Sequence, residues 1–349
     1  MQQKSLNVCD LFPPYVCDAM NHGFAGEVYT DMIPEGRKAI GTHNGTFHSD
    51  ETLSVPMLRL LPEYRTHVIV RTRNQDLLNQ CDIVVDVGGE YDETKNHFDH
   101  HQKGYYATFD DQHKTKMSSA GLVWKHFGKQ IIQQFYPDIT DDATLTRIQE
   151  KMYSAFIEEI DGVDNGIDSA TGEKNYKVTT TVSSRISRLR PAWNEEYTTE
   201  KEIECFRLAM GIMMEELAYH LHEQVEVLLP ARQIVEHAVN VTSEPILVLE
   251  NYCPYLEHLY EIEKERGMEG YFKFVIFQGS DQGWRVKAVN ISIESFALRQ
   301  QLLPHSLGLR DEELCQSCGI EGCVFVHING FMGVNKTKEG ALEMARKSL

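Results

Sequence analysis

The predicted architecture rests on one segment, His43-Asn44-Gly45-Thr46-Phe47-His48-Ser49-Asp50-Glu51. It follows a short apolar run at 38–42, which predicts a strand, and it precedes apolar residues at helical spacing over 53–61. Ser49 or Asp50 can cap that helix. Two imidazoles and two carboxylates therefore stand where a buried strand gives way to a helix, and parallel sheets bind ligands at that edge. We expect a metal site there.

The elements that follow extend this unit into a sheet. Strands are predicted at 66–71 and 82–89, with a short helix or turn at 74–80 between them. The run at 82–89 is apolar and β-branched, as in a strand that is buried on both faces. Strands that alternate with helices in this way are typical of a doubly wound parallel sheet. Further helices are predicted at 119–127, 144–163 and 202–229.

The predicted fold class is α/β: a doubly wound parallel sheet domain followed by a smaller α+β domain. Residues 1–36 are expected to be a lead-in, and 37–190 the metal-binding catalytic domain. Residues 191–230 would form a linker and a long helix, and 231–349 the substrate-binding domain. That last part has predicted strands at 246–249, 271–277, 284–291 and 324–327, and helices at 255–266 and 338–348.

Composition narrows the function classes. The 349 residues favour two domains, and 52 acidic against 34 basic residues give a net charge of −18. That charge argues against a general coat for nucleic acid. The 8 cysteines form no dense framework, which suits a reducing compartment, and no apolar run approaches the ~20 residues that span a bilayer.

The N-terminal residues bear on localisation. They carry Asp10, Asp18, Glu27 and Asp31, whereas a mitochondrial presequence is rich in arginine and poor in acid. There is thus no clear presequence. We expect an intracellular protein of the nucleus or cytoplasm, with the mitochondrion left open.

Four segments supply groups that ligate divalent cations such as Mn²⁺ or Mg²⁺. The candidate ligands are His43, His48, Asp50, Asp86, His100, Asp161 and Asp164. Taken singly, each has an ordinary alternative: a core histidine, a helix cap or an exposed polar turn. Together they favour a metal site, because Asp86 stands in an apolar strand and Asp161 and Asp164 share a helix face near an apolar stripe. An unpaired carboxylate in such a place is costly.

The order of these motifs resembles the DHH phosphoesterase superfamily: His-x4-His-x-Asp, an Asp at a strand end, Asp-His-His, then Asp. Residues 41–51, 86–89, 97–101, 164–166 and 329–333 are similar more closely to the melanocyte-proliferating-gene protein family. The likeness extends over nearly the whole chain after position 36. It implies a bilobed fold and a metal-dependent 3′→5′ exonuclease for single-stranded RNA, acting in nucleus and mitochondria.

The resemblance also implies residue roles. The metal positions are matched by His43, Asp50, Asp86 and His100, and His48 stands where most of the superfamily carries Asp. For the last ligand Asp164 fits the pattern better, with Asp161 as the rival. We expect two divalent cations, manganese with magnesium as the alternative. Asp86 would bridge them, and His101 would face the phosphate.

Substrate contacts are expected further along the chain. Arg188 and Arg190 lie in the most basic short segment, although a solvated helix face would look the same. A glycine turn near the C-terminus can approach a phosphate, or can simply punctuate a strand and a helix. The candidates there are His327, Gly330, Gly333 and Lys336.

Some alternatives stay open from the sequence. Cys315, Cys318 and Cys323 with His327 have the residue types of a zinc site, or are free thiols beside a strand. The expected partner is RNA or a short oligonucleotide, not a membrane, and a homo-oligomer is compatible with the sequence. The alternative functions are a phosphohydrolase for short oligonucleotides, nucleotides or pyrophosphate, and a non-catalytic metal-dependent regulator. The four intact ligand segments speak against the regulator.

Overall fold

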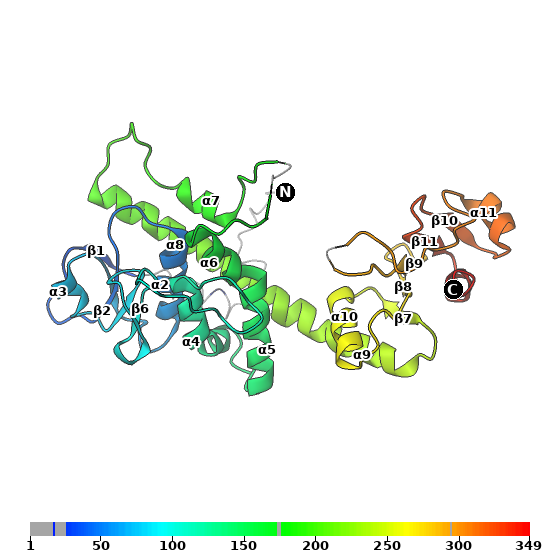
Figure 1. Ribbon diagram of the computed structural model, residues 1–349, viewed down its shortest axis with the longest axis horizontal. Coiled ribbons are helices and arrows are strands. Elements are labelled where there is room, and N and C mark those ends of the chain that lie inside the picture. The colour runs from blue at the N-terminus through cyan, green and yellow to red at the C-terminus, as the bar shows by residue number, and fades with distance from the viewer. Residues whose placement is uncertain (1–16, 18–25, 173–175, 294) are drawn as a thin grey trace, which may run out of the picture. The chain divides into compact units, whose positions relative to one another are not determined.

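The computed structural model describes residues 17, 26–172, 176–293 and 295–349. The chain divides into two compact units, residues 1–224 and 225–349, which we call unit 1 and unit 2. Figure 1 labels many of their elements and colours the chain from its N-terminus to its C-terminus. Most of the predicted lead-in, 1–36, lies outside the described residues.

Unit 1 is built on a six-stranded sheet in the order β1-β3-β2-β4-β6-β5. The strands are β1 Val28–Thr30, β2 Ala39–Thr42, β3 Val68–Arg71, β4 Ile83–Val85, β5 Tyr91–Asp92 and β6 His97–Phe98. All neighbours pair in parallel except β5 and β6. Buried apolar side chains fill β2, β3 and β4, which explains why each reads as a continuous hydrophobic run. The predicted mixed α/β architecture is confirmed.

Three features of this sheet were not expected. The two-residue strands β5 and β6 and their antiparallel pairing were not predicted. Strand β1 lies within the predicted lead-in and pairs in parallel with β3; three residues are too few to show a periodicity. Strand β4 ends at Val85, before the predicted end at Gly89, because Asp86 adopts a φ of 56° and turns the chain.

Unit 1 has the predicted helices in the predicted order with changed bounds, and one further short helix at 182–187 that was not predicted. They are α2 Ser49–Leu60, α3 Gln75–Leu78, α4 Ser119–Phe135, α5 Asp142–Met152, α6 Glu158–Asp164, α7 Val182–Ser187 and α8 Thr199–His222. The helix predicted over 144–163 is divided into α5 and α6 by a π-helical turn, Tyr153–Ile157. The predicted caps of α2 are wrong: His48 is the N-cap, and the Glu51 carboxylate accepts its N–H at 2.8 Å.

Helix α8, which the sequence pattern assigned to a linker, packs against α2 within unit 1. Its apolar stripe is fully buried, and that burial supplies the driving force for packing. The stripe consists of Phe206, Met210, Met213 and Leu217.

Unit 2 holds a five-stranded sheet in the order β10-β11-β9-β8-β7. Its elements are α9 Leu229–Val241, β7 Ile246–Asn251, α10 Leu256–Glu265, β8 Phe274–Gln278, β9 Trp284–Ala288, α11 Asp311–Cys318, β10 Cys323–Val326, β11 Met332–Asn335 and α12 Lys338–Arg346. The predicted antiparallel pairing of β8 and β9 is confirmed, and only β7 and β8 are parallel. Alternate residues of β8 enter two cores: Val275 packs with α9 and α10, and Phe274 with α11 and α12.

Strand β11 and helix α11 were not predicted. Gly333 interrupts the apolar pattern of β11, and α11 is short, acidic and poor in apolar residues. Across the described part of the chain, no helix combines the length and apolarity needed to cross a bilayer.

Candidate metal centre

Three neighbouring strands of unit 1 end at one edge of the sheet. Strands β2, β4 and β6 lie side by side, and polar residues follow each at once: His43, Asp86 and Asp99-His100-His101. Because parallel strands place their carboxyl ends at the same edge, the sheet brings these groups together. The positive φ of Asp86, 56°, is uncommon outside glycine and is the kind of strain that gathers at functional sites.

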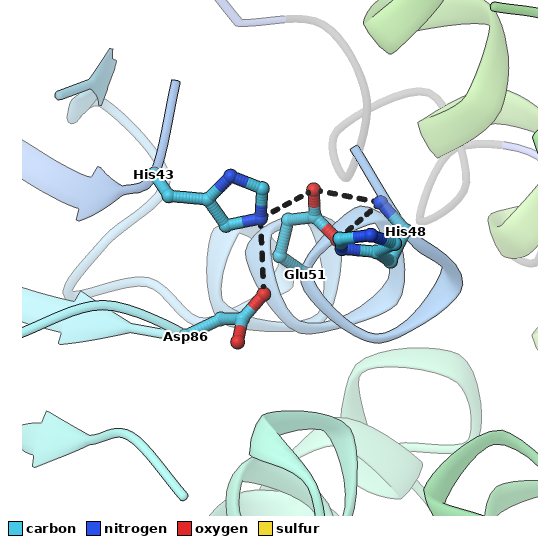
Figure 2. A group of neighbouring side chains, drawn as sticks. All are labelled: His43, His48, Glu51 and Asp86. Carbon is cyan, nitrogen blue, oxygen red and sulfur yellow. Dashed lines mark hydrogen bonds and ion pairs between the residues drawn. The ribbon is translucent and has the colours of Figure 1, made fainter. Parts of the chain in front are cut away.

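The first group of side chains comprises His43, His48, Glu51 and Asp86, whose potential ligand atoms lie within 4.8 Å of one another. His43 Nε2 lies 3.1 Å from Glu51 Oε1 and 3.2 Å from Asp86 Oδ2 (Figure 2). His43, Glu51 and Asp86 are buried, whereas His48 is exposed. Since Glu51 also holds the start of α2, its carboxylate is fixed by the fold.

The second group surrounds His100. Its Nε2 lies 3.0 Å from Asp164 Oδ2, 3.4 Å from Asp86 Oδ1 and 4.0 Å from Asp50 Oδ2. His48, Asp50 and Asp164 also offer ligand atoms within 4.8 Å of one another. Asp86 thus has one oxygen toward His43 and the other toward His100, which places it between the two groups.

Asp50 shows most directly that the cluster suits a cation. Its side chain is fully buried, and neither carboxylate oxygen has a hydrogen-bond partner among the described residues. Burial, with the nearby charges of Asp86, Asp164 and Glu51, raises the pKa of Asp50 well above its usual range. A buried carboxylate without a donor costs several kcal/mol, and a divalent cation would provide the missing partner. Imidazole nitrogens and carboxylate oxygens are suitable ligands for Mn²⁺.

The two buried histidines respond to the same anionic surroundings. Burial opposes the charged form of His43, but hydrogen bonds to Asp86 and Glu51 outweigh it and raise its pKa to about 10. For His100, burial is likewise outweighed by Asp164 and Asp86, and its pKa also rises to about 10. Conversely, burial would raise the pKa of Asp86, but His100 and His43 hold it well below its usual range. The positive charge that these carboxylates attract can come from protons or from metal.

The outer hydrogen bonds orient both histidines for ligation through Nε2. His43 Nδ1 lies 3.1 Å from the carbonyl oxygen of Asn44, which can only accept. His100 Nδ1 lies 3.2 Å from Asn165 Oδ1, and Asn165 Nδ2 donates to the carbonyls of Lys116 and Asp161. Each Nδ1 must therefore carry the proton, which leaves Nε2 of the neutral ring as the free ligand atom.

Asp161, the rival candidate for the last ligand, lies outside the cluster. Its carboxylate accepts hydrogen bonds from Ser118 N, Ser118 Oγ, Gly121 N and Tyr153 Oη at 2.7–2.9 Å. Gly121 makes this approach feasible, because a Cβ there would lie 2.1 Å from Asp161 Oδ2. Asp161 therefore joins α4, α6 and the π-helical turn, and Asp164 is the α6 carboxylate that faces His100.

His101 occupies a different position from His100. Its Nδ1 lies 2.7 Å from Asp99 Oδ1, and the same carboxylate accepts the His101 N–H and the Gly89 N–H. The side chain is 60% exposed. Asp99 thus fixes the Nδ1 tautomer, and Nε2 remains for a solvent molecule or a bound ligand.

A cavity of about 420 Å³ opens beside the cluster. His43, His48, Asp86, His101 and Asp164 contribute to its wall, together with Arg73, Ser183, Ser187 and Arg190. Of the two predicted arginines, Arg190 lines this cavity, whereas Arg188 donates to the Thr179 carbonyl at 3.0 Å and is not part of the lining. The cavity therefore combines the carboxylates with two guanidinium groups.

The other predicted substrate residues belong to unit 2. The Gly330 N–H donates to the His327 carbonyl within the β10–β11 turn, and Gly333 lies inside β11. A Cβ on Gly330 would lie 2.6 Å from Gln301, and one on Gly333 2.7 Å from Leu302, so close packing accounts for both glycines. Lys336 is exposed.

The three cysteines proposed as zinc ligands lie near one another, but the His327 ring contacts other residues. Cys318 Sγ and Cys323 Sγ are 3.7 Å apart, and Cys315 Sγ contacts the Cys323 carbonyl at 3.8 Å. His327 Nδ1 accepts the Asn329 N–H, and its ring centroid lies 4.5 Å from that of Phe331. Within the described residues this arrangement is that of thiols beside a strand.

Sequence reasoning did not name Glu51, Asn165 or Arg73 as site residues, although Glu51 is one of the two carboxylates counted in the segment 43–51. Glu51 reads as part of a helix start, and only the fold shows its second contact with His43. Asn165 belongs to the quoted segment 164–166 but was given no role, and Arg73 follows a strand without a motif of its own. The signals that could have drawn attention to them are the position of Asn165 next to Asp164 and that of Arg73 just after the strand end at Arg71.

Fold and cluster first define a class: a mixed α/β protein with an imidazole–carboxylate centre at the edge of a parallel sheet. Residues 39–349 match the family model MYG1_exonuc, described as "Uncharacterised protein family (UPF0160)". The chain is 42% identical to the "MYG1 protein" of Dictyostelium discoideum, over 89% of this chain and 96% of the relative. It is 45% identical to the "MYG1 exonuclease" of Rattus norvegicus, over 89% of this chain and 84% of the relative.

The chain therefore belongs to the MYG1 family. The resemblance predicted from the motifs is confirmed, and so, at the level of the family, is the prediction of an enzyme, because named members are exonucleases. Among solved structures, the exonuclease RecJ bound to manganese aligns with 99% of this chain and 95% of its own, at 13% identity and a TM-score of 0.22. A TM-score this low does not establish a shared fold.

Proposed function

We propose that the protein is a metal-dependent phosphodiesterase of the DHH phosphoesterase kind, a 3′→5′ exonuclease on single-stranded RNA. The observation that carries the proposal is Asp50, a buried carboxylate without a hydrogen-bond donor. It lies next to Asp86, Asp164 and two histidines whose Nδ1 hydrogen bonds leave Nε2 as the ligand atom. The name of the rat relative, MYG1 exonuclease, supports the same reaction class.

The residues present fit two divalent cations, Mn²⁺ or Mg²⁺. His43, Glu51 and Asp86 would hold one, and Asp50, Asp86, His100 and Asp164 the other, with His48 at the rim of both groups. Bound there, the cations would lower the pKa of a water molecule and neutralise charge on a phosphate. Asp86 keeps the two groups together because each of its oxygens faces a different histidine.

The remaining residues of the cavity bind and orient the substrate. Arg73 and Arg190 present guanidinium groups that suit a phosphodiester, since arginine binds phosphate in a bidentate manner. Arg190 Nε is buried without a hydrogen-bond partner among the described residues, so it can still acquire one. His101, whose Nδ1–H is oriented by Asp99, can accept a proton at Nε2 and pass it on to the leaving oxygen.

The size of the cavity supports removal of one nucleotide at a time. A volume of about 420 Å³ is at the lower end for ligand pockets, and it suits a terminal nucleotide rather than a duplex. The net charge of −18 also disfavours a long electrostatic groove. The same observations favour one second candidate, a phosphohydrolase for nucleotides or very short oligonucleotides.

The decisive experiment uses purified full-length protein, Mn²⁺ and single-stranded RNA labelled at the 5′ end. We expect a ladder that shortens one nucleotide at a time from the 3′ end, and a 3′-terminal block should abolish it. Asp86→Asn should lower the rate by at least about 10²–10³-fold, while asparagine tolerates the left-handed backbone at this position.

Asp82→Asn is the matched control. Asp82 stands at the other end of β4, accepts the Ala39 N–H and lies outside the cluster. This variant should cleave as the wild type does. Full activity of the Asp86→Asn protein would refute the metal-bridging role, and release of phosphate from nucleotides without an RNA ladder would favour the second candidate.

A further inference from the structure

Unit 2 contains a cavity of its own, of about 430 Å³, which the metal centre does not use. It lies where β9 ends and where the turn between β10 and β11 passes. Its wall combines aromatic rings with amide and ammonium groups: Tyr255, Lys287, Asn290, Phe296, Asn329 and Phe331. A wall of this composition has the features of a specific ligand pocket, apolar with a few convergent polar groups.

Two aromatic side chains of this cavity are accessible to a ligand. Phe296 is 98% exposed, although burying a phenylalanine would stabilise the fold by about 1.5–3 kcal/mol. Phe331 is half-buried, and its ring is held 4.5 Å from that of His327. Asn290 Nδ2 donates to the Ser295 carbonyl at 2.7 Å, which ties the loop carrying Phe296 to the end of β9. Ile291 and Ile293 of the same loop are also exposed, and such a group of exposed apolar side chains indicates a binding surface.

Two polar side chains of the cavity can also form hydrogen bonds with a ligand. Among the described residues, the Lys287 ammonium forms no ion pair or hydrogen bond, and the Asn329 side-chain amide forms no hydrogen bond. Lys287 lies in β9, next to the strand that follows Phe331, so the sheet fixes its position. A purely apolar ligand would leave these groups without partners, and burial without partners is unfavourable.

We propose that this cavity binds an unpaired nucleobase together with its adjoining phosphate. The base stacks on Phe296 and Phe331, the Asn329 amide pairs with its hydrogen-bonding edge, and Lys287 binds the phosphate. Stacking on aromatic side chains and pairing with exposed edges is the way in which proteins bind single-stranded RNA. The proposal rests on the proposed function, and it adds a base-binding site in unit 2 that is separate from the metal ligands.

Binding without catalysis tests the proposal. Full-length protein in EDTA is titrated into a fluorescein-labelled RNA hexamer, and fluorescence anisotropy reports the affinity. We expect Phe296→Ala to weaken binding about 5- to 150-fold, which corresponds to ~1–3 kcal/mol for one stacked base. Phe331→Leu and Lys287→Gln should also weaken it. Because Phe296 is almost fully exposed, its removal leaves the fold intact.

Two controls match these changes. Ile234→Ala removes an exposed apolar side chain of α9, and Lys264→Gln removes a charge from α10, and neither residue lines the cavity. Both should bind as the wild type does. An abasic hexamer of equal charge should bind as weakly to the wild type as RNA binds to Phe296→Ala. Wild-type affinity of Phe296→Ala and Phe331→Leu would overturn the proposal, and so would tight binding of the abasic strand.

Competition identifies the source of the base. If adenosine monophosphate is sufficient to displace the labelled hexamer, the site is supported and its ligand is a free nucleotide. Displacement only by unlabelled oligonucleotide supports it with an RNA strand as the ligand, and displacement by neither overturns it. If the manganese cleavage assay fails while base-dependent binding persists, the proposed function falls and this site stands. If cleavage proceeds and Phe296→Ala binds RNA as the wild type does, the proposed function stands and the base-binding site is refuted.

Discussion

Two aspartates of α6, three positions apart, differ in what surrounds them. Asp161 accepts hydrogen bonds from four donors at 2.7–2.9 Å, whereas Asp164 faces His100 at 3.0 Å. Asp161→Asn replaces one acceptor with a donor that faces other donors, so it should destabilise the protein by about 1–3 kcal/mol. Asp164→Asn changes only the contact with His100, so it should destabilise the protein less than Asp161→Asn does, and it should weaken Mn²⁺ binding. Urea unfolding and isothermal titration calorimetry separate the two effects.

The two variants are controls for each other. Each keeps the size of the side chain and removes one negative charge from the same helix. Weakened Mn²⁺ binding in a stably folded Asp161→Asn protein would mean that Asp161 is a ligand, contrary to the assignment drawn from its donors.

The histidines of the cluster predict the pH dependence of metal binding. Without a cation, the pKa of His43 and that of His100 are about 10, because the surrounding carboxylates outweigh burial, so both rings are charged at neutral pH. Ligation requires the neutral ring, so binding of Mn²⁺ must release these protons. The affinity should therefore rise with pH, by up to about tenfold per unit for each proton.

Calorimetry in buffers with different ionisation enthalpies counts the protons. We expect at least about one proton for each of the two histidines in the wild type, because Asp50, whose pKa is also raised, can add to the count, and fewer protons for His43→Gln. A heat of binding that does not depend on the buffer would contradict ligation by either ring.

At the scale of elements, the sequence predicted that the site residues meet at one edge of the sheet, because the end of a strand can be recognised from a few neighbouring residues. β2 and β4 are mostly apolar runs followed by a polar residue, and parallel neighbours bring such ends to one edge; the two-residue strand β6 was not predicted, and only the motif that follows it drew attention to that edge. The choice between Asp161 and Asp164 was beyond the sequence, because both lie on one helix face. Only the positions of Gly121 and Tyr153 decide which carboxylate is enclosed by donors.

Contacts between distant elements were also beyond the sequence. Arg71 of β3 donates to the His43 carbonyl at 3.2 Å and to the Gly45 carbonyl at 2.7 Å, and it pairs with Glu202 of α8. Glu202 accepts the Gly45 N–H at 3.0 Å. A buried charge at a strand end gives no hint of a partner 131 positions later, so the sequence pattern placed α8 in a linker. In the structure α8 holds the loop that carries His43.

This connection yields a prediction for Arg71. Arg71→Met leaves the Glu202 carboxylate without its buried partner, and breaking such a pair costs about 3–5 kcal/mol. The loop that carries His43 loses two donors at the same time, so Mn²⁺ affinity should fall as well. Urea unfolding and Mn²⁺ titration measure the two losses.

A double variant provides the control. Arg71→Met with Glu202→Met removes both charges, and the methionines can pack against Phe206, over whose ring the guanidinium now lies at 4.4 Å. The double variant should be more stable than Arg71→Met alone. Strictly additive losses would show that the two residues do not act as a pair.

At the scale of the whole molecule, each of the two proposed ligand sites contains basic side chains, although the net charge is −18. Arg73 and Arg190 line the cavity of unit 1, and Lys287 lines that of unit 2. The affinity for phosphate then depends on a few arginine and lysine side chains whose positions are fixed by the fold. An acidic protein can in this way bind the end of a strand and still not coat nucleic acid.

Because every proposed metal ligand belongs to unit 1, Mn²⁺ should stabilise that unit selectively. At 100 times the dissociation constant the gain is about 2.7 kcal/mol, which slows exchange up to about 100-fold for amides that exchange through opening of the unit. Hydrogen exchange with mass spectrometry should show this protection over 43–51 and 83–101. Peptides from 225–349 should exchange as before, and an RNA hexamer added in EDTA should protect 287–293 and 329–331 instead. Asp86→Asn should remove the Mn²⁺ effect and keep that of RNA; equal protection of both units by Mn²⁺ would show that the metal binds elsewhere.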